Sequence, residues 1–246
     1  MSIVALRAGE IEIVQASMLG SILSNLLLVL GMCFFLGGIY NLRDPQGLGW
    51  EQTFSSGTAQ TTCSLMTLSA ASMIIPAALF KFLDHDGSAK ESVIILSRGT
   101  SVILLILYCM YLYFSLYTHK HLFEPEASTE RHETKIFMGP WSAAAVLIVT
   151  TLIISVCADY MVDSIDALVA TGKISKTFIG LILIPIVGNA AEHVTACVVA
   201  VKNKMDLAMS VAIGSSIQIA LLVTPSLVML GWAIGQPMTL HFETCE

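Results

Sequence analysis

An ionisable pair lies inside one of the most apolar parts of this sequence. The stretch IPIVGNAAEHVTACVV, residues 184–199, has apolar flanks and carries Asn189, Glu192 and His193 at its centre. A charged side chain in the middle of a membrane-spanning helix costs about 2.5–3.5 kcal/mol on insertion scales. Such residues mark ion pathways or binding sites by default. The spacing i, i+3, i+4 predicts that the three side chains share one helix face.

Further polar residues recur at helical spacing in two other apolar segments. Ser21, Ser24 and Asn25 share a face in the first segment, and Ser215 and Gln218 share a face in the last. With the carboxylate and amide they form a ligand set that is all oxygen apart from the imidazole. Oxygen ligands suit hard cations, and calcium takes about six to eight of them. The alternative is that these small polar residues only pack membrane helices together.

We therefore predict a cation site made by Glu192, Asn189, Ser215, Gln218, Ser21, Ser24 and Asn25. His193 is predicted to couple or tune protons beside it, the alternative being that the imidazole only packs there. Pro185 lacks an N–H and so frees the carbonyl of Leu181. Gly188 is expected to let another backbone approach closely.

The composition places these residues in a membrane protein. Of 246 residues, 55% are hydrophobic and 12% are charged, whereas a soluble domain has about 25% charged residues. A helix needs about 20 apolar residues to cross the bilayer core. The predicted fold is all-α and polytopic, with six full spans at about 13–39, 57–80, 96–117, 139–160, 175–201 and 207–234.

Several other classes of protein are excluded. The six cysteines are scattered without a CxxC, which indicates neither a disulfide framework nor a zinc site. The net charge of −6 gives no sign of nucleic-acid binding. HExxH, GxSxG and P-loop patterns do not occur, so no enzyme and no cofactor is predicted. Lys and Arg divide evenly between the two sides of the membrane, which leaves the orientation undecided.

The first and last spans are related by an internal repeat. A shift of 194 residues pairs Gly20 with Gly214 and Ser21 with Ser215. The copies are five crossings apart, so they run in opposite directions, as in transporters built from inverted repeats. The chain then divides into a first-repeat portion, a polar connecting loop and a second-repeat portion, at residues 1–117, 118–138 and 139–246.

Two clusters of acidic residues can each be interpreted in two ways. The loop at 119–135 is either a solvated connection or a segment that attracts cations. Asp159, Asp163 and Asp166 mark either a wet helix end or a cation vestibule.

Three stretches resemble the calcium/proton exchangers of the cation/calcium exchanger superfamily, in particular the vacuolar type. They are GNAAEH at 188–193, AIGSSIQIALLVTP at 212–225 and the segment 5–31. The resemblance implies an inverted-repeat exchanger in which Glu192 carries calcium or protons alternately and Asn189 is a neighbouring ligand. Ile219 stands where sodium/calcium exchangers usually have an acidic residue, which favours the proton branch.

The resemblance also implies a second glutamate, which the 194-residue shift places three residues before Met1. We therefore expect a chain shortened at both ends relative to the family, and calcium exchange that requires more than residues 1–246.

The predicted function is exchange of calcium for protons across an intracellular membrane, with the vacuolar membrane implied by the resemblance. The partners are calcium ions, protons and the lipid bilayer; assembly into a homo-oligomer is left open. The alternatives are exchange of another divalent cation such as manganese for protons, sodium/calcium exchange, a channel, and an inactive membrane fragment or scaffold.

Overall fold

The computed structural model describes residues 2–42, 56–83, 89–119, 139–170, 175–240 and 242. Every regular element in these ranges is helical, as predicted. In chain order the elements are α1 (Ser2–Arg7), α2 (Ile11–Leu23), η1 (Ser24–Val29), α3 (Leu30–Tyr40), α4 (Ser56–Leu83), α5 (Ala89–Tyr113), η3 (Phe114–Thr118), α7 (Pro140–Ala170), α8 (Lys176–Phe178), η4 (Ile179–Leu183), α9 (Ile184–Gly188), α10 (Ala190–Val201), α11 (Met205–Gln218), η5 (Ile219–Val223) and α12 (Thr224–Ile234). The η segments are π-helical turns.

Four described helices are long and apolar enough to cross a membrane, at Ile11–Tyr40, Ser92–Thr118, Pro140–Ile165 and Met205–Ile234. A fifth is added if the bent pair Lys176–Gly188 and Ala190–Val201 counts as one span. The sequence predicted six. The sixth predicted span, at 57–80, corresponds to α4, a helix of 28 residues. Some of its side chains are not described, and α4 is not among the spans given above.

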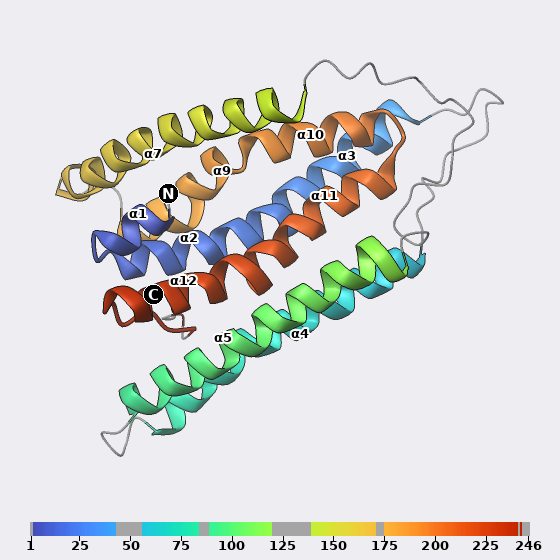
Figure 1. Cartoon of the computed structure of the whole chain (residues 1–246). Coiled ribbons are helices and arrows are strands. Elements are labelled where there is room, and N and C mark those ends of the chain that lie inside the picture. Colours follow the sequence, from blue (N-terminus) through green and yellow to red (C-terminus); the bar gives the residue numbers. More distant parts are fainter. Residues whose placement is uncertain are drawn as a thin grey trace.

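Two long helices form the centre of the bundle and run in opposite directions (Figure 1). The first is α2–η1–α3 and the second is α11–η5–α12, and they contact each other along much of their length. The broken helix α8–η4–α9–α10 packs on one side of this pair, and the α4–α5 hairpin packs on the other. α7 lies at the edge, where Ala158 and Ile165 are buried. The central pair corresponds to the two copies of the sequence repeat.

Each long central helix contains a π-helical turn at an equivalent position. The shift of 194 residues brings η1 onto η5, apart from the first residue of η1. η4 and η5 both end two residues before a proline, Pro185 and Pro225 respectively. Since a proline removes one i→i−4 hydrogen bond, a wider π turn lets the helix continue in a new register. Thr224 also donates its hydroxyl to the carbonyl oxygen of Ile219, at 2.9 Å.

The broken helix crosses α2 at two glycines. A Cβ atom on Gly20 would overlap the carbonyl oxygen of Leu181 and would lie 2.7 Å from Cγ of Pro185. A Cβ atom on Gly180 would lie 2.8 Å from Cβ of Ala16. The two backbones therefore touch, and the carbonyl that Pro185 frees faces Gly20. At Gly188, where a close approach was expected, nothing described lies within 4 Å of a Cβ, so that expectation was wrong.

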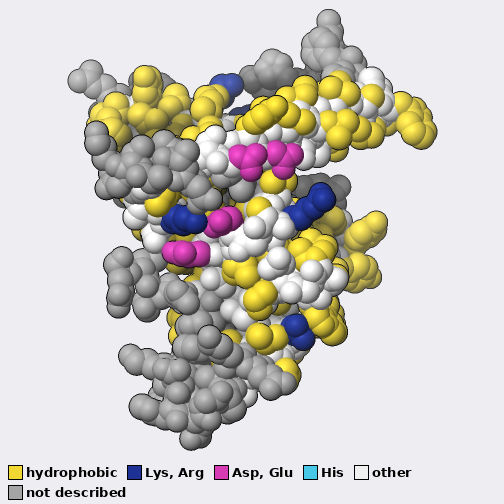
Figure 2. All heavy atoms as spheres, turned by 90° about the vertical axis from the view of Figure 1, so that its left-hand side faces the viewer, with side chains coloured by type: hydrophobic (Ala, Val, Ile, Leu, Met, Phe, Trp, Pro, Cys, Tyr) yellow, Lys and Arg dark blue, Asp and Glu magenta, His cyan; other side chains and the backbone are white. Residues whose placement is uncertain are grey.

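Charged and polar groups fasten the helix ends. Lys176 Nζ lies 3.3 Å from Oε2 of Glu10, which joins the start of the broken helix to the turn before α2. Figure 2 shows acidic and basic side chains together on this end of the bundle, with hydrophobic side chains around them. Such an arrangement is expected where helices leave the hydrocarbon core for water.

The segment after α12 folds back into the bundle. Gly235 ends α12 in a left-handed conformation, with φ of 77°. Gln15 then donates its side-chain amide to the carbonyl of Thr239 at 3.0 Å, and the N–H of Leu240 donates to Oγ of Ser97 at 3.1 Å. Leu240 is completely buried. The segment thereby fastens α12 to α2 and α5.

Gly20 and Gly214 occupy equivalent positions in the repeat, so they offer a matched test of the crossing. Gly20→Ala should lower the free energy of unfolding by about 1–3 kcal/mol, because the new methyl group meets a backbone carbonyl that cannot move aside cheaply. Gly214→Ala should stabilise by about 0.5–1 kcal/mol, because nothing described lies within 4 Å of its Cβ and a helical glycine is replaced. Unfolding in micelles followed by circular dichroism measures both, and equal effects would contradict the crossing.

Candidate functional site

The polar stretch at residues 184–199 lies at a break between two helices. α9 ends at Gly188, α10 begins at Ala190, and the two parts of the span are bent by 55°. Asn189 at the break has φ of −102° and ψ of 11°, outside the regular helical conformation. The predicted single helix face for the three polar residues is therefore interrupted. Asn189 occupies the N-cap position of α10 without a capping hydrogen bond from its side chain, and Glu192 and His193 follow in the first turn.

The break has a physical cause and a chemical consequence. Pro185 already weakens the helix before it, and asparagine competes for backbone hydrogen bonds, which favours caps over helix interiors. A helix that begins inside a span directs backbone N–H groups and a partial positive charge at its start. Glu192 in the first turn is stabilised by that charge. Interrupted helices of this kind hold substrate sites in membrane transporters.

Two side chains of η1 meet the first turn of α10. Oγ of Ser24 lies 3.3 Å from Nε2 of His193. The side-chain amide of Asn25 also lies close enough to the carboxyl group of Glu192 to interact with it. The first and fifth predicted spans thus touch at their polar residues.

Asn25 also reaches the last predicted span. Its Nδ2 donates to Oγ of Ser215 at 2.8 Å, and Ser215 donates in turn to the carbonyl of Ala212 at 3.1 Å. Asn25 is only 1% exposed. One buried amide therefore connects three elements, η1, α10 and α11, and its bond to Ser215 spans 190 residues of sequence.

Two amide atoms at this junction have no hydrogen-bond partner among the described residues. They are Oδ1 of Asn25 and Nδ2 of Asn189, and both atoms are buried. A buried polar atom without a partner costs about 1–3 kcal/mol. The carbonyl oxygen of Asn25 is the type of atom that a hard cation prefers. The junction therefore offers a cation one further oxygen ligand beside the carboxylate, Oδ1 of Asn25.

The remaining predicted residues lie less centrally. Ser21 is buried one turn before Ser24, and no polar contact of its side chain with the other predicted residues is among those described. Gln218 is exposed at the end of α11, without a described contact to the junction. Glu192 is itself exposed, whereas His193 is 7% exposed.

Of the two clusters of acidic residues with open interpretations, the structure describes the side chains of Asp159 and Asp163. The described residues contain no group of three or more His, Cys, Asp or Glu that could hold a metal ion. Asp159 and Asp163 are exposed on α7. The polar loop at 119–135 lies outside the described residues except for His119, and the connecting segment 118–138 likewise except for its first two residues.

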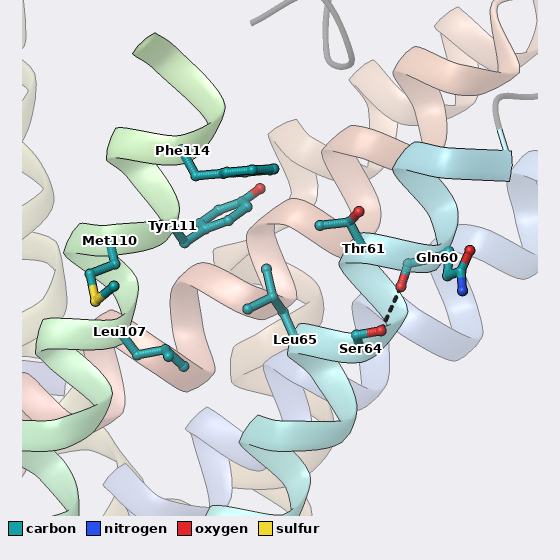
Figure 3. Close-up of a pocket in the computed structure, with 8 residues that line it drawn as sticks. All are labelled: Gln60, Thr61, Ser64, Leu65, Leu107, Met110, Tyr111 and Phe114. Carbon is teal, nitrogen blue, oxygen red and sulfur yellow. Dashed lines mark hydrogen bonds between the residues drawn. The ribbon is translucent and has the colours of Figure 1, made fainter. Parts of the chain in front are cut away.

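A cavity of about 660 Å³ lies elsewhere in the bundle, between α4 and α5 (Figure 3). The side chains of Tyr111 and Phe114 point across it toward α4. Ser64 at its edge donates its hydroxyl to the backbone carbonyl of Gln60 at 2.8 Å. None of its lining residues carries a charge, so a cation has stronger ligands at the junction of η1 and α10.

Sequence reasoning placed these residues in one site and predicted that the first and fifth spans meet there, but it did not predict the individual contacts. It grouped Ser24 with Asn25 by helical spacing, but it did not predict that one would contact His193 and the other Glu192 and Ser215. The π turn η1 begins at Ser24 and changes the direction of the following side chains. Nothing in the local sequence signals that turn, because η1, unlike η4 and η5, is not followed by a proline.

Comparisons with known proteins agree with this architecture. The sequence pattern of the sodium/calcium exchanger protein family matches residues 1–117 and 142–245. The vacuolar calcium ion transporter of Schizosaccharomyces pombe is 48% identical over 246 residues, which is all of this chain and 58% of that protein. The vacuolar cation/proton exchanger 3 of Oryza sativa subsp. japonica is 39% identical over all of this chain and 59% of its own length.

Solved structures resemble the fold as well. The crystal structure of the selenium-substituted Ca2+/H+ antiporter protein YfkE superposes with a TM-score of 0.76 at 33% sequence identity, over 98% of this chain and 66% of that one. This chain thus spans about three fifths to two thirds of the length of these relatives. Its sequence pattern and its fold place it in one family of multi-pass membrane transporters: the chain belongs to the sodium/calcium exchanger protein family.

Proposed function

We propose that the protein carrying this sequence exchanges calcium ions for protons across the vacuolar membrane. The observation that carries the proposal is the junction of η1, α10 and α11, where Asn25 contacts both Glu192 and Ser215. The names of the relatives supply the substrates: one is a vacuolar calcium ion transporter and another a Ca2+/H+ antiporter.

Exchange follows from competition for one carboxyl group. A carboxyl group away from water favours its neutral, protonated form, and a neighbouring cation favours the ionised form. A proton and a calcium ion therefore exclude each other at Glu192. Oδ1 of Asn25 and the hydroxyl of Ser215 supply neutral oxygen ligands that replace part of the hydration shell of calcium.

Alternating access requires that the junction face one side of the membrane at a time. The central helices α2–η1–α3 and α11–η5–α12 run in opposite directions and each supplies a polar residue to the junction. Inverted repeats of this kind rock about a site near the middle of the bilayer. We infer that movement of the broken helix against this pair opens the junction to either side.

Glu192 tests the proposal most simply. Glu192→Gln should reduce proton-driven calcium uptake into membrane vesicles to background, because the amide has no charge to exchange between calcium and a proton. Glu12→Gln is the matched control, since Glu12 is an exposed carboxylate on α2 outside the junction, and it should keep uptake near the wild-type level. Wild-type uptake in the Glu192 variant would rule out its role.

The same vesicles separate the other transport mechanisms. A channel would pass calcium down its gradient, but a proton gradient would not concentrate it. Uptake driven by a sodium gradient would indicate sodium/calcium exchange, and strong competition by manganese would indicate a broader choice of divalent cation.

Two adjacent serines test the neutral part of the site. Ser215 and Ser216 both donate to the carbonyl of Ala212, at 3.1 and 3.0 Å, but only Ser215 also accepts from Asn25. Ser215→Ala leaves the amide of Asn25 without that partner, which costs about 1–3 kcal/mol. We expect the calcium concentration for half-maximal uptake to rise about fivefold or more, since about 1 kcal/mol corresponds to that factor. Ser216→Ala should leave this concentration unchanged, and the same shift in both variants would contradict the site.

His193 should tune transport rather than carry the cation. Its Nε2 contacts Ser24, a neutral hydroxyl, and an imidazole changes charge between about pH 5 and 8, the range that a proton exchanger works across. We expect His193→Gln to change the rate or the pH response of calcium uptake while part of the uptake remains. Complete loss of uptake in a variant that is present in the membrane at the normal level would contradict this role.

A further inference from the structure

Two cysteines from distant parts of the sequence lie against each other beside the junction. Cys33 is on α3 and completely buried, and Cys197 is on α10 and half-buried. Their thiol groups interact electrostatically across the contact between the two helices. Both are free cysteines, and both belong to the apolar cluster that joins α3, α10 and α11. The scattered cysteines of the sequence gave no indication of this pair.

The pair connects the two helices on which the proposed site depends. α3 continues from η1, which carries Ser24 and Asn25, and α10 begins with Glu192 and His193 in its first turn. Beyond the cysteines the same two helices are held by Asn41, whose Nδ2 lies 3.3 Å from the carbonyl oxygen of Val201. The thiols therefore lie between the junction and this contact, on helices that are kept side by side.

We propose that Cys33 and Cys197 are a redox-sensitive dithiol, which a peroxide converts into a disulfide between α3 and α10. Cys197 is the more accessible thiol and reacts first. Its sulfur attacks one peroxide oxygen, the O–O bond breaks, and a sulfenic acid and a water molecule form from hydrogen peroxide. The sulfur of Cys33 then attacks the sulfur of Cys197, the S–O bond breaks, and a second water leaves as the disulfide forms. The two thiols are oxidised and the peroxide is reduced.

The disulfide would stop the movement of α10 relative to α3. A hydrogen bond such as that of Asn41 can break and form again in each transport cycle, whereas a disulfide opens only when a thiol attacks it. This consequence rests on the proposed exchange function, but formation of the disulfide does not. Because a reductant restores both thiols, the effect on transport is reversible.

The test uses membrane vesicles that contain the protein carrying this sequence. They are treated with hydrogen peroxide, and the remaining thiols are then blocked. Peptide mass spectrometry should find Cys33 linked to Cys197 with loss of two hydrogen atoms. Calcium uptake should fall to a small fraction of that in untreated vesicles, and dithiothreitol should restore it. Cys33→Ser should keep its uptake under peroxide, whereas Cys109→Ser, which removes an exposed cysteine on α5, should be inhibited like the wild type.

Each result decides one part of the proposal. If peroxide modifies the exposed cysteines but leaves Cys33 and Cys197 unlinked, the dithiol is ruled out. If the disulfide forms and uptake continues unchanged, the claim that it stops the helices is wrong. Absence of uptake in untreated, reduced vesicles would count against the proposed function alone, because the peptide analysis still reports on the cysteine pair.

Discussion

The structure depends on one constraint: a polar group inside an apolar span needs a partner from another part of the chain. Water is scarce there, so a carboxylate or an amide must find its hydrogen bonds within the protein. Glu192, Asn25 and Ser215 meet this requirement together, because one buried amide serves both the carboxyl group and the hydroxyl group. Their combination fixes how three helices that are far apart in sequence lie against one another.

The close approach that this combination requires comes from the backbone. Gly20 and Gly180 bring α2 and the broken helix into direct contact, so side chains of η1 reach the first turn of α10. Pro185 and Asn189 interrupt the helix just where these side chains arrive. The same features that weaken the helix leave Oδ1 of Asn25 and Nδ2 of Asn189 without described partners. A site that binds and releases an ion needs such incompletely satisfied groups, because a fully bonded junction would have no vacant ligand.

Much of this arrangement can be predicted from the sequence, and the limits have physical reasons. Apolar periodicity and length predict helical spans, since both follow from the thickness of the bilayer. The repeat with Gly20 and Gly214 predicts two antiparallel central helices. Glu192 can be recognised as a site residue because a charged side chain inside a membrane span costs free energy. The bend at Asn189 has local signals in Pro185 and Asn189 that were not recognised, whereas the π turn at Ser24 has no local signal and the contacts of its side chains depend on another helix. For the same reason the glycines at the crossing of α2 and the broken helix were Gly20 and Gly180 rather than Gly188, and the contact between Cys33 and Cys197 was not foreseen.

The central claim is that a cation binds at the junction between Glu192 and Asn25. The most direct measurement is anomalous diffraction at long wavelength from crystals of the protein grown with calcium. Our account predicts a calcium peak within coordination distance of the carboxylate of Glu192 and of Oδ1 of Asn25, and it predicts that the peak disappears in crystals of the Glu192→Gln variant. A calcium peak elsewhere in the bundle, with the junction closed by protein hydrogen bonds alone, would contradict it.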